Sequence, residues 1–269
     1  MSSQQQPKVW FVTGSSTGLG RCLVEYLLSK SEIVVATLRK PEVLNDLKAK
    51  YPTTQLLILR LDVANRTEVD AAFEKVKVAF GHLDVVVNNA GRAMLSEVEG
   101  FQRKMPALCL TPGVGGRLFN ISSVSGLHPS PETAFYSASK FALEALTQSL
   151  AAELDPEWKI KVTIIEPGTF ETEVFGNGID VPIHPKYNKP GLPAVVFRDY
   201  LAKRKVGSAG DPVKAVAKFY ELAQLPEPPM RLALGKDAIY MGRAHIANLT
   251  KDLDAMESWS EDLGFDAKH

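Results

Sequence analysis

Short apolar runs alternate with amphipathic segments along the first half of the chain. The runs are rich in Val, Leu and Ile and have the length of strands; they cover residues 8–13, 33–38, 55–61 and 83–88. The segments between them show helical spacing, most clearly at residues 66–80. Near-continuous apolar strands are typical of parallel sheets that are covered on both faces. The alternation therefore predicts an α/β fold, a doubly wound Rossmann-type domain with a mainly parallel sheet.

The second half repeats this rhythm and then interrupts it. Its pattern predicts strands at 117–122, 159–165 and 230–234, and helices at 134–154, from Asp211 onwards and at the carboxyl end. Residues 170–210 have no regular pattern, and an irregular stretch of that length is more often a functional lid than a linker. Its apolar residues, among them Phe175 and Phe197, fit either the lining of a pocket or, as we favour, the packing face of a small lid helix. We expect residues 1–269 to form a single domain, with a substrate lid at 170–210.

Composition narrows the class of protein. The 269 residues are 45% hydrophobic and 23% charged, with a formal net charge of +0, so no basic surplus favours nucleic acid. The chain starts without a signal-peptide pattern and has no apolar run long enough to span a membrane. Cys22 and Cys109 are too few for a disulfide framework, and the five histidines lack metal-ligand spacing. We therefore expect a cytoplasmic protein that binds no metal, nucleic acid or membrane.

A glycine cluster follows the first predicted strand and opens the first helix. The cluster runs from Thr13 to Gly20, and its candidate cofactor-binding residues are Gly14, Ser16, Gly18, Leu19 and Gly20. Glycine lets backbone N–H groups approach a pyrophosphate closely, and the amino end of a helix adds a favourable dipole. The position between strand and helix makes this a predicted nucleotide-binding loop rather than an ordinary turn.

The TGxxxGxG spacing of this loop resembles the glycine motif of the classical short-chain dehydrogenase/reductases. Other stretches agree in order and spacing, so that the resemblance runs from about residue 8 to about 260. It implies further cofactor contacts at Asp62, Val63, Asn89, Ala90, Gly91, Pro167, Gly168 and Thr172. The tail at residues 228–238 is similar to the branch that resembles 17-beta-hydroxysteroid dehydrogenases and many fungal oxidoreductases.

The end of the second strand bears on the choice of nicotinamide cofactor. An acidic residue there would bind the ribose 2′-hydroxyl and favour NAD(H). The chain instead has Leu38, Arg39 and Lys40, and an arginine can pair with a 2′-phosphate through two hydrogen bonds. We therefore expect NADP(H) in preference to NAD(H).

Ser123, Tyr136 and Lys140 resemble the catalytic set of the same family. Tyr136 and Lys140 are four residues apart near the start of a predicted helix and so share one face. A free tyrosine has a pKa near 10, and a lysine ammonium nearby would lower it. The resemblance implies that Tyr136 exchanges a proton with a carbonyl or alcohol oxygen, that Ser123 holds that oxygen, and that Lys140 also binds the nicotinamide ribose.

The connection from Gly91 to Arg117 departs from the family. Classical members have a long helix there with an asparagine that extends the proton relay of the lysine, whereas this segment is shorter by about 20 residues, has no asparagine and contains several Gly and Pro residues. The helices of this region also form the usual oligomer interface of the family, so we expect that interface to be lost or rebuilt. The favoured function is NADP(H)-dependent interconversion of a ketone and a secondary alcohol. The alternative is a cofactor-binding protein of the same fold without redox turnover, either a non-redox isomerase or cyclase or a pseudoenzyme.

Overall fold

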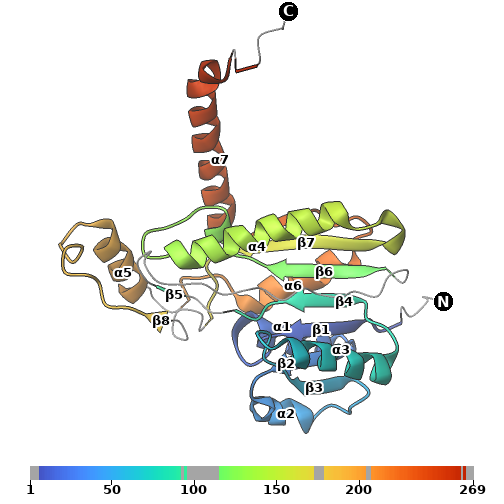
Figure 1. Ribbon diagram of the computed structural model, residues 1–269. Coiled ribbons are helices and arrows are strands. Elements are labelled where there is room, and N and C mark those ends of the chain that lie inside the picture. The colour runs from blue at the N-terminus through green and yellow to red at the C-terminus, as the bar shows by residue number, and fades with distance from the viewer. Residues whose placement is uncertain are drawn as a thin grey trace, which may run out of the picture.

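The computed structural model describes residues 6–91, 94–95, 115–172, 179–203, 207–261 and 263–264. Seven parallel strands form one sheet in the order β3-β2-β1-β4-β6-β7-β9 (Figure 1). The strands are β1 (Val9–Thr13), β2 (Ile33–Leu38), β3 (Leu56–Arg60), β4 (Val85–Asn88), β6 (Gly116–Ile121), β7 (Ile160–Pro167) and β9 (Arg231–Leu234). The strand order reverses between β1 and β4, and ligands of open α/β sheets bind at such a point.

Helices cover both faces of the sheet, as its apolar strands require. The helices are α1 (Gly18–Ser29), α2 (Asn45–Lys48), α3 (Arg66–Phe80), α4 (Ala134–Glu153), α5 (Pro193–Lys203), α6 (Pro212–Gln224) and α7 (Lys236–Met256). Leu27 of α1 and Phe219 of α6 belong to one fully buried core cluster, while Val76 of α3 belongs to the cluster on the other face, against which Leu150 of α4 packs (Figure 1). The predicted doubly wound fold is therefore confirmed.

Local sequence signals set the helix boundaries. Asn65 caps α3 by accepting the Thr67 N–H at 3.1 Å, and Gly81 ends that helix with φ +74°, a conformation that glycine adopts without strain. Asp211 caps α6 in the same way, accepting the Val213 N–H at 2.8 Å ahead of a proline in the first turn. These signals place α3 and α6 where the sequence predicts them.

Residues 170–210 and the connection from Gly91 to Arg117 each contain regular structure that their sequence pattern does not indicate. Residues 170–210, which have no regular sequence pattern, contain the small helix α5, which includes Phe197, and β8 (Ile179–Asp180). Their role as a lid stays a prediction. β8 pairs in parallel with β5 (Met94–Leu95), away from the main sheet. The rest of the shortened connection from Gly91 to Arg117 lies almost wholly outside the described residues.

Helix α7 leaves the body of the molecule and projects away from the sheet (Figure 1). Its first turns contact the body, since Ala238 and Gly242 are buried. Every residue from Ile246 to Glu261 is exposed. Among the helices of the described ranges, none combines the length and the apolar character needed to cross a membrane.

Candidate active site

The glycine loop joins β1 to α1 at the carboxyl edge of the sheet. Gly14 and Gly18 have φ +69° and +58°, values that favour glycine. Gly20 is buried, and a Cβ there would lie 2.3 Å from the Gly14 carbonyl oxygen. Ser15 fixes the turn from within, because its hydroxyl donates to the Val12 carbonyl at 3.0 Å. Leu19 packs against the core, while Ser16 is half-buried at the surface of the loop.

The end of β4 is fastened directly to this loop. The Asn89 side-chain amide donates to the carbonyl oxygens of Thr13 and Gly14 at 2.9 and 3.2 Å. In return, the Thr13 hydroxyl accepts the N–H groups of Asn89 and Ala90, each at 2.9 Å. A Cβ on Gly14 would lie 2.8 Å from the Ala90 Cα atom. The residues after the two central strands thus form one rigid cradle, and its close backbone approaches fit a dinucleotide pyrophosphate.

The predicted adenine end lies on the neighbouring strands. Leu38 is buried at the end of β2, and Arg39 next to it is exposed and forms no ion pair with any residue in the described ranges. Asp62 follows β3, where its carboxylate accepts the Ala64 N–H at 3.0 Å and its own N–H donates to Glu68. Val63 packs against the core. These residues lie at the carboxyl ends of β2 and β3, on one side of β1, which is the side expected for an adenosine.

Pro167 and Gly168 end β7 on the other side of the loop. A Cβ on Gly168 would lie 2.1 Å from the Asp237 carboxylate, which accepts the Thr169 N–H at 2.6 Å. Thr172 comes close to the glycine loop, because a Cβ on Gly18 would lie 3.6 Å from the Thr172 Cβ atom. Asp237, at the start of α7, therefore anchors the Pro-Gly turn. The sequence offered no sign of this role, because the partners are far apart along the chain.

Ser123, Tyr136 and Lys140 meet where β6 ends and α4 begins. The Lys140 Nζ atom lies 5.6 Å from the centre of the Tyr136 ring and donates a hydrogen bond to the Ile121 carbonyl at 2.8 Å. A Cβ on Gly91 would lie 4.0 Å from the same Nζ atom, so the lysine faces the end of β4. The Ser123 hydroxyl faces the Tyr136 phenol and also accepts the Ser125 N–H at 3.1 Å. The structure thus brings the three predicted catalytic side chains together beside the cradle.

The electrostatics of Tyr136 differ from our expectation. Burial raises the pKa of its phenol, and the hydrogen bond with Ser123 opposes only part of that rise. Burial also lowers the pKa of the Lys140 ammonium from 10.5 to about 8, against the attraction of Glu144. Burial is therefore the largest influence on the phenol pKa, and it acts against the lowering that we expected from Lys140.

A buried cluster of charged residues lies directly behind this set. The Ser122 hydroxyl donates to Glu144 Oε1 at 2.6 Å, and Arg231 Nη1 lies 2.6 Å from Glu144 Oε2. The same Nη1 atom also binds Glu166. Burial and the nearby Glu144 carboxylate raise the pKa of Glu166 to about 7. Two carboxylates, only 4% and 1% exposed, therefore share one arginine.

Sequence reasoning missed this cluster. Glu144 was one turn beyond Lys140 and thus on the predicted site face, which was the available signal. Gly126 makes room for it, since a Cβ there would lie 2.1 Å from Glu144 Oε1. Arg231 and Glu166 belong to adjacent strands whose register only the folded sheet reveals.

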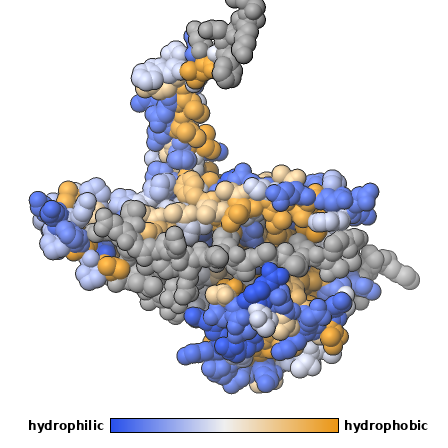
Figure 2. All heavy atoms as spheres, viewed as in Figure 1, coloured by the Kyte–Doolittle hydropathy of each residue, from blue (hydrophilic) through white to orange (hydrophobic). Residues whose placement is uncertain are grey.

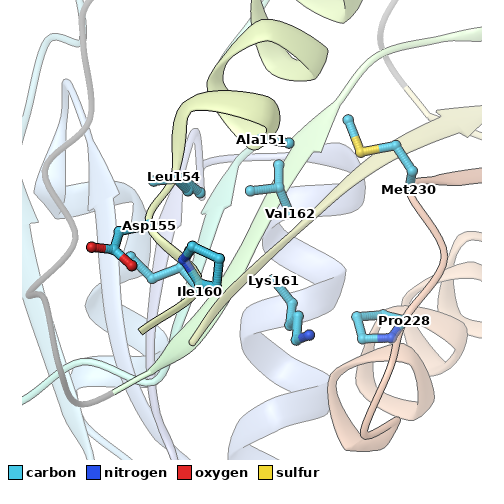
Figure 3. Close-up of a pocket in the computed structure, with 9 residues that line it drawn as sticks. Ala151, Leu154, Asp155, Ile160, Lys161, Val162, Pro228 and Met230 are labelled. Atoms are coloured by element: carbon cyan, nitrogen blue, oxygen red, sulfur yellow. The ribbon is translucent and has the colours of Figure 1, made fainter. Parts of the chain in front are cut away.

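Two further features near the sheet, His128 and a surface pocket, lie outside the candidate active site. His128 lies in the loop before α4, where its Nδ1 atom is buried without a hydrogen-bond partner among the described residues and its ring meets His245 edge-on. A surface pocket lined by Leu154, Val162, Met230 and neighbouring residues lies at the amino end of β7 (Figure 3). The pocket is lined by the first three residues of that strand, and the remaining five separate it from the cradle by about 16 Å. Within the described ranges, no group of three or more His, Cys, Asp or Glu residues could hold a metal ion.

The chain matches a family model described as short chain dehydrogenase over residues 8–107 and 94–178. An uncharacterized oxidoreductase of Schizosaccharomyces pombe is 34% identical, with 95% of this chain and 91% of that protein aligned. An oxidoreductase of Botryotinia fuckeliana is 31% identical over 94% of this chain and 97% of its own. Membership of the steroid-dehydrogenase-like branch and the shortening after Gly91 stay predictions.

Solved structures agree with these sequence relatives. A short-chain dehydrogenase from Streptomyces avermitilis superposes with a TM-score of 0.81 at 30% identity and covers 97% of this chain and 100% of its own. A short-chain dehydrogenase from Burkholderia cenocepacia in complex with NADP shares the fold, with a TM-score of 0.65 at 22% identity over 93% of this chain and 97% of its own. The chain therefore belongs to the short-chain dehydrogenase family and is an oxidoreductase of that family.

Proposed function

We propose that the protein is an NADP(H)-dependent oxidoreductase that interconverts a ketone and a secondary alcohol by hydride transfer. The observation that carries the proposal is the meeting of Ser123, Tyr136 and Lys140 beside the glycine cradle. The cradle requires Gly14 and Gly20, since a Cβ at either position would meet backbone atoms. A bound reduced nicotinamide supplies the hydride that adds to the carbonyl carbon.

Residues of the chain itself transfer the proton and position the substrate and the cofactor. Tyr136 donates its phenolic proton to the carbonyl oxygen in the direction of reduction and takes it back in oxidation. The raised pKa of the phenol keeps it protonated at neutral pH, which suits reduction. Ser123 donates a hydrogen bond to the same oxygen, and the Lys140 ammonium holds the ribose hydroxyls.

The preference for NADP(H) rests on Arg39. Its guanidinium is exposed at the end of β2, no carboxylate occupies that strand end, and a 2′-phosphate presents the geometry that arginine binds through two hydrogen bonds. We assign the remaining cofactor contacts to the cradle and to the residues that follow β3 and β7. We further propose that residues 170–210 serve as the substrate lid over the site, with α5 as the lid helix. Residues 1–269 then form one domain.

Nucleotide titration of the wild-type protein tests the proposal, followed by NADPH oxidation with a panel of ketones. We expect NADPH to bind at least tenfold more tightly than NADH and to be oxidised by some of the ketones. Arg39→Ala removes the preference, whereas Lys48→Ala, an exposed cation on α2, keeps it. Equal affinity for the two nucleotides in the wild type contradicts the assigned cofactor.

A second function, cofactor binding without redox turnover, is favoured by one sequence observation. No asparagine occurs between Gly91 and Asn120, so the residue that extends the lysine proton relay in classical members is missing. NADPH binding without oxidation by any ketone of the panel would select this second function.

A further inference from the structure

The outer half of α7, residues 246–256, is exposed along its whole length and receives no packing from the described residues of the body. Ala238 and Gly242 are buried, Leu127 contacts the helix near Gly242, and the His245 ring packs on Phe141 at 6.4 Å between centroids. Beyond that ring every side chain to the end of the helix is exposed. An isolated helix shorter than about 12–15 residues is marginal in water. A partner that packs against the outer half would therefore stabilise it.

One side of this unsupported half is apolar. Ile246, Leu249, Leu253 and Met256 are between 51% and 63% exposed, and they follow one another at intervals of three, four and three residues. That spacing places them on one stripe, as at the a and d positions of a coiled coil. Figure 2 shows an apolar stripe running along the projecting helix, beside a hydrophilic face.

The charges of α7 are arranged unevenly along its length. Residues 236–246 carry +1, from Lys236, Asp237 and Arg243, whereas residues 247–256 carry −1, from Lys251, Asp252 and Asp254. Glu257 and Glu261 directly after the helix add −2. The last turn of the helix contains no basic residue, although the helix dipole favours cations there. The acidic outer end thus lacks compensation within its own helix.

A second copy of the same helix in antiparallel orientation would cover the apolar stripe and bring a cation close to the acidic end. Glu257 and Glu261 of each chain then lie near Arg243 of the other, and the two apolar stripes cover each other around a two-fold axis. A parallel arrangement would place the acidic ends side by side. An anionic membrane surface is disfavoured, because the exposed half is itself acidic.

We propose that the outer half of α7 is a homodimer interface in which two copies of the helix pair antiparallel through Ile246, Leu249, Leu253 and Met256. The interface is independent of the catalytic set and of the proposed activity.

Sedimentation velocity of the full chain at tens of micromolar tests the proposal. We expect the wild type to sediment as a dimer, with twice the 29.4 kDa of one chain. Leu249→Glu and Leu253→Glu should each raise the dimer dissociation constant at least tenfold, while Asn248→Glu, at a matched exposed position on the opposite side of α7, should leave it unchanged. A single cooperative thermal transition in the monomeric variants shows that the body remains folded. Its midpoint should be somewhat lower than that of the wild type, because the partner no longer stabilises the native state.

Charge reversal tests the orientation. Arg243→Glu alone and the pair Glu257→Arg with Glu261→Arg should each weaken the dimer, and all three changes together should restore it. A monomeric wild type, a dimer insensitive to the stripe variants, or reversals that fail to restore each other would overturn the proposal. So would binding of the monomer to phosphatidylserine vesicles through the same stripe.

Discussion

Ser122 and Glu144 share a hydrogen bond of 2.6 Å that ties the end of β6 to the middle of α4. Both residues are buried, and each adjoins a proposed catalytic group: Ser122 precedes Ser123, and Glu144 lies one turn beyond Lys140. The inner face of α4 is polar where it meets the sheet, with Ser137, Glu144 and Thr147 as its buried residues. The position of the catalytic set thus depends on buried hydrogen bonds as well as on apolar packing.

Replacement of Glu144 should therefore destabilise the fold. Glu144→Ala leaves the buried Ser122 hydroxyl without its acceptor and removes one of the two carboxylates that bind Arg231. We expect this substitution to lower the free energy of unfolding by about 2 kcal/mol. Glu144→Gln keeps an acceptor for Ser122 and should cost less. Urea unfolding measures both, with the exposed Ser149→Ala on the same helix as the control. A loss equal to that of the control would contradict the structural role of the cluster.

Glu166 should make stability depend on pH. Its folded-state pKa is raised to about 7, so the folded protein holds this proton more tightly than the unfolded chain does. The contribution of Glu166 to stability is therefore greatest at acidic pH, declines as the pH rises towards about 7 and is lost above it. In Glu166→Gln we expect the urea midpoint to fall less between pH 5 and pH 8 than in the wild type. The exposed Glu74→Gln should keep the wild-type slope, and an identical slope in Glu166→Gln would refute the assignment.

The close approach at Gly20 should be essential for cofactor binding. In Gly20→Ala the new methyl group would lie 2.3 Å from the Gly14 carbonyl oxygen and 2.5 Å from Asn89 Nδ2, so the loop must shift. We expect the dissociation constant for NADPH to rise at least tenfold, measured by fluorescence titration. Gly264→Ala, where a Cβ meets nothing within 4 Å, serves as the control. Wild-type affinity in Gly20→Ala would show that the loop does not hold the pyrophosphate.

The alternation of apolar runs and helical segments predicted the sheet, because a parallel sheet needs strands that are apolar on both faces. The glycine loop and the Tyr136–Lys140 pair were also readable, since their spacing along the chain fixes their spacing in space. Asp237 and Arg231 were not, because each acts on residues more than sixty positions away. The pKa direction of Tyr136 was missed for a related reason: burial depends on packing that no local pattern reports.

Lys140 should link cofactor affinity to pH. Burial lowers its pKa to about 8, so the ammonium that we propose to hold the ribose hydroxyls loses its proton as the pH rises through that value. We expect NADPH affinity to decline above pH 8 in the wild type. Lys140→Met should bind more weakly at pH 7 and show no such decline. A parallel decline in both proteins would assign the titration to another group.

We propose that one cradle binds the nicotinamide cofactor and that the adjoining Tyr136 transfers the proton that redox turnover requires. The most direct test measures NADPH affinity and NADPH oxidation, with a ketone from the panel, in wild-type protein and in Tyr136→Phe. The account predicts affinity within about threefold of wild type and a kcat lower by about 100-fold or more, because only the proton donor is removed. Undiminished turnover in Tyr136→Phe would contradict it.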